Sequence, residues 1–135
     1  LIVSRGLGDV YKRQYLDLTK IRLPMSAFSS ITHRLSGMYI FFITLPMMLY
    51  MIDQSISSKA SFERLIIEIT SISAFSIFIF LSIAIFWYHI LTGIRHLIMD
   101  FFHIGESLNG SYYSSIFTII LWIVTSLVFF GYLFI

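Results

Sequence analysis

Residues 71–98, "SISAFSIFIFLSIAIFWYHILTGIRHLI", decide the fold of this chain. The run is apolar along most of its length and exceeds the roughly 20 residues that a helix needs to cross a bilayer. It nevertheless contains His89, Arg95 and His96, and Asp100 follows shortly after its end. Ionisable side chains are costly in hydrocarbon, so groups placed there need partners. The run therefore predicts a membrane-spanning helix with a functional polar face.

Two further apolar segments, residues 29–52 and 112–135, are also long enough to span a membrane. Short polar stretches, 53–68 and 100–110, separate the three segments. The composition is 58% hydrophobic and 12% charged, and a soluble domain of 135 residues could not bury that much apolar surface. We therefore expect an all-α integral membrane protein with three transmembrane helices. Pro46 should kink the first of them without ending it.

The composition also excludes several classes of site. The chain has no cysteine, which rules out a disulfide framework, a thiolate-bound iron–sulfur cluster and a cysteine zinc site. A net charge of +2 without a basic cluster does not suggest a nucleic-acid partner. Residues 1–14, "LIVSRGLGDVYKRQ", lack the membrane pattern, and we interpret them as a non-native or disordered segment. The membrane domain should then occupy residues 15–135.

The distribution of positive charge predicts the orientation. Seven of the nine Lys and Arg residues lie before the first helix, at its start or near the end of the second; only Lys59 and Arg64 lie in the other connection. Positive residues accumulate on the cytoplasmic side of membrane proteins. The N-terminus should therefore be cytoplasmic and the C-terminus periplasmic.

The second helix carries a polar stripe. At 100° per residue, His89, Gly93, His96 and Asp100 fall within about 60° of one another, and His89 lies roughly 16 Å deeper than Asp100. A neutral imidazole offers one lone pair to a metal, and haem iron commonly takes imidazole as an axial ligand. Gly93 would leave room for a flat macrocycle. The spacing of His96 and Asp100 allows a hydrogen bond between them.

The first helix opens with "SSITHRLSG", residues 29–37, which places Ser30, His33, Arg34 and Gly37 on one face. They should lie level with His96 across the bundle. A hydroxyl and a guanidinium one turn apart can hold a carbonyl group, such as that of a quinone, or an anion, such as a haem propionate.

Each feature also has a simpler structural interpretation. A membrane-embedded histidine can form a hydrogen bond between helices, and an arginine in the first turn is often an interfacial anchor. Gly37 and Gly93 can serve only to let helices pack closely. Taken one at a time, these features do not specify a function.

Together they resemble a known family. "SSITHRLSG" followed by "YHILTGIRHLIMDF" (88–101), and preceded by "YLDLTKIRLPMSAFSS" (15–30), resembles the cytochrome b556 subunit of succinate dehydrogenase in its proteobacterial form. That subunit is one of two membrane anchors of respiratory complex II. The resemblance covers residues 15–135. It implies a subunit that passes electrons from succinate, through an iron–sulfur subunit, to quinone in the tricarboxylic acid cycle and respiratory chain.

The resemblance also implies roles for single residues. His89 would be an axial ligand of the iron of one haem b, shared with the sister anchor. Ser30 and Arg34 would belong to the site of the substrate ubiquinone, with Asp100 close to that pocket. The haem propionates would lie near three basic side chains, His33, Arg34 and His96.

The second axial ligand should come from another chain. We expect His33, His96 and His103 to lie too near the cytoplasmic surface, by a helical turn or two, to reach the same iron. The family's other small anchor supplies that ligand, and a larger helical bundle is expected in any case. The other implied partners are the iron–sulfur subunit, the flavoprotein subunit and membrane lipid; this chain itself would perform no succinate chemistry.

The implied location is the bacterial inner membrane, more so than the mitochondrial one. Two alternatives remain open. One is a haem b anchor of the fumarate reductase type, working in the opposite direction. The other is a non-redox membrane scaffold or small transporter that uses the same polar face for helix contacts.

Overall fold

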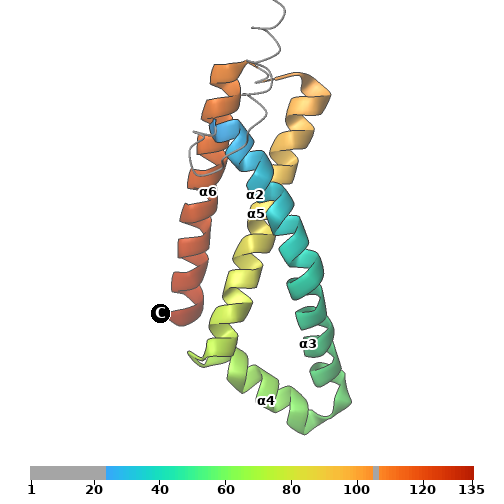
Figure 1. Ribbon diagram of the computed structural model, residues 1–135. Coiled ribbons are helices and arrows are strands. Elements are labelled where there is room, and N and C mark those ends of the chain that lie inside the picture. The colour runs from blue at the N-terminus through green and yellow to red at the C-terminus, as the bar shows by residue number, and fades with distance from the viewer. Residues whose placement is uncertain (1–23, 105–106) are drawn as a thin grey trace, which may run out of the picture.

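The computed structural model describes residues 24–104 and 107–135, which form helices along almost their whole length and contain no strand (Figure 1). The first rod, Met25–Ser57, consists of α2 (Met25–Tyr39), a π-helical turn η1 (Ile40–Thr44) and α3 (Leu45–Ser57). The chain continues through three further helices, α4 (Lys59–Thr70), α5 (Ala74–Phe102) and α6 (Leu108–Phe134). The segment 1–14 lies outside the described residues.

Three of these rods are long and apolar enough to cross a membrane. They are Met25–Ser57 with 33 residues, Ala74–Phe102 with 29 and Leu108–Phe134 with 27. This confirms the all-α fold with three transmembrane helices. Serine side chains cap two of these helices at their start: Ser73 Oγ accepts from the Ser76 amide at 3.1 Å, and Ser107 Oγ accepts from the Gly110 amide at 3.1 Å.

The first connection, expected as a short polar stretch over 53–68, contains a helix of its own. A capping box between Ser58 and Ser61 starts α4, and Ser61 Oγ donates to the Gln54 carbonyl at 2.7 Å, which ties α4 to α3. The helix is amphipathic, with Phe62, Leu65, Ile66 and Ile69 within one arc of about 100°. Figure 1 shows α4 crossing from the end of α3 to the start of α5.

A π-helical turn occupies the position where Pro46 was expected to kink the first helix. Proline has no N–H group, so the Phe42 carbonyl loses its usual α-helical partner. The five residues of η1 end just before this proline, and the Leu45 amide donates to the Ile40 carbonyl. The wider turn thus rearranges the hydrogen bonds ahead of the proline, and the helix continues to Ser57.

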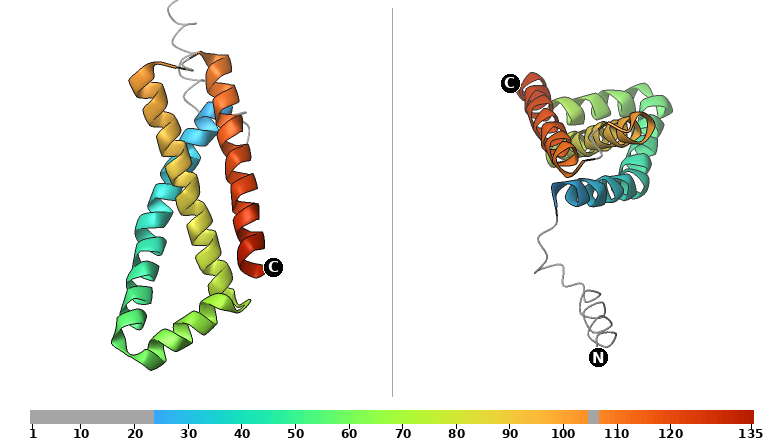
Figure 2. Two further views of the ribbon diagram at one scale, coloured as in Figure 1. Left: turned by 180° about the vertical axis from the view of Figure 1, so that it is seen from behind. Right: turned by 90° about the horizontal axis from the view of Figure 1, so that it is seen from above.

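Small hydroxyl side chains fill the contacts between the helices. α2 packs against α5 and α6, whereas α3 diverges from α5 toward α4 (Figures 1 and 2). The buried set is rich in serine and threonine, whereas most large apolar side chains are exposed; the fully enclosed ones are Thr92, Ser29, Ser82 and Ser115. Small residues allow close helix approach in membranes, and the exposed apolar surface suits lipid or other membrane helices.

Candidate functional site

Two histidines meet where α2 crosses α5. The rings of His33 and His89 are stacked, with centroids 4.1 Å apart and planes 6° from parallel. His33 was expected to lie a helical turn or two nearer the cytoplasmic surface than His89, too far to reach the same iron; the expected difference in depth was wrong. The reason is that α2 begins at Met25, a turn earlier than the apolar segment indicated, so His33 lies about 12 Å into the helix. His96 lies beside the pair, 5.7 Å from the His33 ring.

Hydrogen bonds fix the tautomer of His89. Its Nδ1 lies 3.0 Å from Ser36 Oγ and 3.2 Å from the His33 carbonyl oxygen. The Ser36 hydroxyl donates its proton to that same carbonyl at 2.6 Å, so Ser36 Oγ is left to accept from His89. Nδ1 therefore carries the hydrogen, and Nε2 carries the lone pair that can bind a metal.

His33 is held in the same way by the opposite helix. Its Nδ1 lies 2.6 Å from Thr92 Oγ1, and Thr92 donates its own proton to the Tyr88 carbonyl at 2.8 Å. One residue before each histidine, Thr32 and Tyr88 also share a hydrogen bond. The two helices thus present matching segments to each other.

This symmetry explains two residues that the sequence analysis missed. Ser36 and Thr92 each follow a histidine by three residues, in "HRLSG" (33–37) and "HILTG" (89–93). Each hydroxyl binds the histidine of the other helix. The repeated pattern H-x-x-[ST]-G was the available signal, and only its histidine and glycine positions had been interpreted.

The glycines of the repeat make room for the rings. A Cβ atom on Gly37 would lie 3.1 Å from His89 Cε1, and one on Gly93 would lie 3.4 Å from His33 Cε1. Each glycine therefore faces the histidine of the other helix. This supports the packing interpretation of both residues; at Gly93 the nearest group is the imidazole of His33.

An open cavity of about 540 Å³ adjoins the histidines. Its size lies within the range of about 300–1,000 Å³ typical of small-molecule sites. Its lining includes five of the six residues expected to bind haem or quinone, all except Asp100. The five are Ser30, His33, Arg34, His89 and His96, and Gly93 and apolar side chains of α5 complete the lining. The cavity is thus lined by imidazole, hydroxyl and guanidinium side chains.

The comparisons with known proteins bear on this arrangement. A sequence profile of the succinate dehydrogenase/fumarate reductase transmembrane subunit family matches residues 9–129. The chain belongs to this family. It is also similar to the succinate dehydrogenase cytochrome b556 subunit of Coxiella burnetii (strain RSA 493 / Nine Mile phase I), with 38% identity over 87 residues, which are 63% of this chain and 67% of that protein. The resemblance drawn from the motifs is confirmed, and the chain is a membrane subunit of a larger complex.

Asp100 stands apart from the other site residues of this transmembrane subunit. It lies in the last turn of α5, is exposed and does not line the cavity. Among the described residues its side chain forms no hydrogen bond with His96, although the spacing of four residues allows one. Its expected place near the quinone pocket stays a prediction.

Arg95 faces away from the cavity, as its place on the helix indicated. Its side chain is buried against α6, where Nε donates to Ser114 Oγ at 3.1 Å. Nη2 donates to the Ser111 carbonyl at 3.1 Å and to Ser111 Oγ at 3.2 Å. This arginine therefore fastens α5 to α6 and takes no part in the site.

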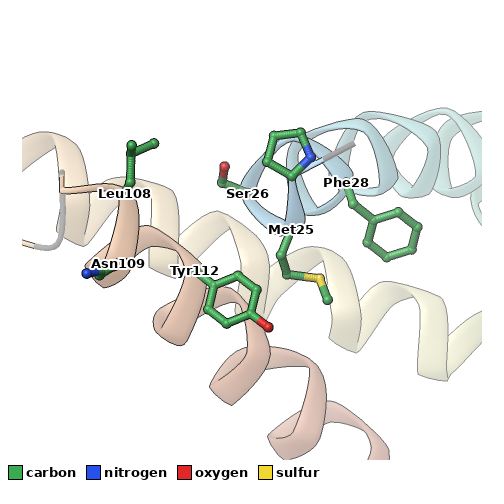
Figure 3. A pocket seen from close by; sticks show the side chains of 7 residues that line it. Met25, Ser26, Phe28, Leu108, Asn109 and Tyr112 are labelled. Carbon is green, nitrogen blue, oxygen red and sulfur yellow. The ribbon is translucent and has the colours of Figure 1, made fainter. Parts of the chain in front are cut away.

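A second cavity, at one end of the described helices, is lined by neither histidine nor a charged side chain. It has a volume of about 590 Å³ and lies between the starts of α2 and α6, where Figure 3 shows Met25 and Tyr112 extending into the space between the helices. Among residues 24–104 and 107–135, no group of three or more His, Cys, Asp or Glu side chains could hold a metal ion alone. A bare metal site in the described part of the chain is therefore not supported.

Proposed function

We propose that this chain is the haem b-binding anchor of a succinate dehydrogenase and forms part of its quinone-reduction site. The observation that carries the proposal is the cavity whose lining includes His89, Ser30 and Arg34. Electrons from succinate would arrive through iron–sulfur clusters of another subunit. They would leave on ubiquinone at this cavity.

His89 fits the role of an axial ligand. Its Nδ1–H is engaged by Ser36 and the His33 carbonyl, so the ring is oriented and Nε2 is the nitrogen with a free lone pair. Bound haem would supply a one-electron store between the iron–sulfur clusters and the quinone. Arg34, His33 and His96 line the same cavity and would hold the propionates by charge and hydrogen bonding.

The second axial ligand would come from a sister anchor subunit. His33 is close to His89, but its ring lies parallel to that of His89 at 4.1 Å. Two imidazoles on one iron must point their nitrogens at it from opposite sides, and stacked rings do not. The cavity is also open at the protein surface, where another helical chain would complete it. The two subunits would then share one haem.

Ser30 and Arg34 would position the quinone. They lie one turn apart on α2, with Ser30 half-buried and Arg34 exposed. The hydroxyl would donate to a quinone carbonyl, and the guanidinium would stabilise the negative charge that develops during reduction. Asp100 lies near the same end of the bundle and would be an acidic group close to the site. Protons would come from the adjacent water.

The remaining partners follow from the same proposal. The iron–sulfur and flavoprotein subunits would dock at the end of the bundle where α2 begins, which the positive-inside rule assigns to the cytoplasm of a bacterium. The C-terminus would then be periplasmic. A fumarate reductase working in the opposite direction is the second candidate, because the matched family includes subunits of both enzymes.

Purification of the complex through a tag on this chain tests the proposal. We expect the preparation to contain a flavoprotein, an iron–sulfur subunit, a second small membrane subunit and a reducible b-type pigment. It should oxidise succinate with ubiquinone faster than it reduces fumarate with a quinol. A chain that purifies alone and without pigment would refute the proposal, and a faster fumarate reaction would favour the second candidate.

A further inference from the structure

We propose that Ser36 is a positioning residue for the haem ligand, fixing the tautomer and ring plane of His89 and so setting the strength of its bond to iron. This inference rests on the proposed function, in which His89 binds the haem iron. Ser36 itself would touch neither haem nor quinone. It would act only through the imidazole.

The hydrogen-bond chain around Ser36 has a single direction. Ser36 Oγ donates to the His33 carbonyl at 2.6 Å, and His89 Nδ1 donates to Ser36 Oγ at 3.0 Å. The same carbonyl also lies 3.2 Å from His89 Nδ1. Ser36 is 6% exposed, so no solvent competes for these contacts. The imidazole is therefore held on a buried acceptor provided by α2.

The surroundings leave the His89 ring little freedom. The backbone of Gly37 lies against one edge, since a Cβ there would be 3.1 Å from Cε1. The His33 ring covers one face. With the ring plane confined by these contacts, the Ser36 hydroxyl and the His33 carbonyl together hold the hydrogen on Nδ1. Nε2 is left available as the ligand.

The chemistry predicts what the loss of this hydroxyl would do. An acceptor on Nδ1–H makes an imidazole more electron-rich and a stronger ligand, and removal of such partners typically costs about 10–100-fold in metal affinity. A more electron-rich ligand favours ferric over ferrous iron. Ser36→Ala should therefore weaken haem binding about tenfold and shift the haem midpoint potential to more positive values.

The opposite helix indicates which substitution of Ser36 should keep the hydrogen bond to His89. Thr92 occupies the position in "HILTG" that Ser36 occupies in "HRLSG", and its hydroxyl binds His33 at 2.6 Å. A threonine is thus accommodated in the matching environment. Ser36→Thr should restore the acceptor and with it the wild-type haem potential.

Ser82 provides a matched control. It is a fully buried serine at the same α2–α5 contact, and it binds Tyr39 at 3.1 Å and not His89. Ser82→Ala removes one buried hydroxyl from this interface, as Ser36→Ala does. It should change neither the haem potential nor haem retention.

The experiment compares intact, purified complexes of wild type, Ser36→Ala, Ser36→Thr, Ser82→Ala and His89→Ala. Haem content, the rate of haem transfer to excess apomyoglobin and the midpoint potential are measured for each. We expect Ser36→Ala alone among the serine variants to show faster transfer and a positive shift, with Ser36→Thr near wild type. Equal effects of Ser36→Ala and Ser82→Ala would reduce Ser36 to a packing residue and overturn the inference.

His89→Ala distinguishes failure of the proposed haem ligand from failure of the proposed role of Ser36. If it abolishes the wild-type haem signal while Ser36→Ala leaves both potential and transfer unchanged, the inference fails and the proposed ligand stands. If His89→Ala retains a wild-type haem spectrum, the proposed ligand fails and the role of Ser36 fails with it.

Discussion

The backbone of Gly37 lies against the imidazole of His89, such that a Cβ atom at residue 37 would be 3.1 Å from His89 Cε1. This is closer than ordinary van der Waals contact. The His89 ring cannot readily move away from residue 37, because Ser36 and the His33 carbonyl hold its Nδ1. Gly37 therefore matters through the space that it leaves for the proposed haem ligand.

Gly37→Ala should destabilise the complex and weaken haem binding, because the added methyl must displace the His89 ring or the helix. Overpacking of this kind typically costs about 1–3 kcal/mol. The measurement is thermal unfolding of the purified complex together with its haem content. Gly93→Ala should have a smaller effect, since its Cβ would meet His33 Cε1 at 3.4 Å.

Gly131→Ala is the control for both glycine variants, because nothing lies within 4 Å of a Cβ at that position. Alanine is favoured over glycine in helices by up to about 1 kcal/mol, so the midpoint of unfolding should stay level or rise. Equal losses in all three variants would show that the histidine contacts are not the cause.

Arg95→Met should loosen the packing of α5 on α6. The substitution removes the three hydrogen bonds that the Arg95 guanidinium donates to Ser111 and Ser114 of α6. Hydrogen bonds to charged groups contribute about 1.5–3 kcal/mol, so a loss of that order is expected in the unfolding of the complex. The haem potential should stay at its wild-type value, because Arg95 does not line the cavity.

Arg64→Met provides the comparison for the arginine variant. Arg64 is exposed on α4 and makes one hydrogen bond of 3.4 Å to its own helix, so its loss should change stability by less than about 0.5 kcal/mol. If Arg95→Met unfolds no earlier than Arg64→Met, the buried hydrogen bonds do not hold α5 to α6.

Single cysteines test the proposed orientation, and the chain offers a background without native cysteine. Lys59→Cys at the start of α4 should react with an impermeant maleimide added outside spheroplasts. Asp100→Cys at the end of α5 should react only in inverted vesicles. The reverse pattern would contradict the orientation inferred from Lys and Arg.

The spanning helices were predictable from the sequence, whereas their ends were not. A run such as 71–98 is recognisable as a spanning helix by its length and its apolar composition. A polar cap such as Ser107 lengthens a helix without adding to its hydropathy, so α6 begins at Leu108, ahead of its apolar segment 112–135. The helix α4 was missed for a related reason, since its charges and serines resemble a loop unless the apolar positions 62, 65, 66 and 69 are placed on one arc.

The site was predictable in its members and less so in its geometry. Ser30, Arg34, His89 and His96 do share one cavity, as the face of each helix indicated. The depth of His33 was wrong because depth depends on where a helix starts and how two helices cross. Neither the start of a helix nor the crossing of two helices can be deduced from the residue spacing within one helix. Ser36 and Thr92 were missed because a hydroxyl in a membrane helix usually bonds to its own backbone.

Arg34→Leu should impair quinone reduction selectively. Removing a group that stabilises developing charge typically lowers a rate by about 100-fold or more, so the ubiquinone-dependent rate of the complex should fall by that order. Succinate oxidation with a soluble dye acceptor should stay near wild type, because the proposed succinate chemistry lies on another subunit. Arg64→Leu, on the exposed face of α4, is the control and should leave both rates unchanged.

Ser30→Ala should give a milder form of the same defect, with a higher KM for quinone, because it removes a neutral hydrogen-bond donor and retains the charge of Arg34. The measurement is the quinone dependence of the succinate-driven rate. A defect of equal size in the dye assay, for either Ser30→Ala or Arg34→Leu, would indicate failed assembly and would argue against a quinone site on α2.

The absorption spectrum of the dithionite-reduced complex from His89→Ala tests the central claim most directly. We expect its b-type bands to be lost or strongly altered, while His103→Asn, at an exposed position with a φ of 50° that asparagine tolerates, keeps the wild-type bands. An unchanged spectrum from an assembled His89→Ala complex would contradict the assignment of His89 as the haem ligand.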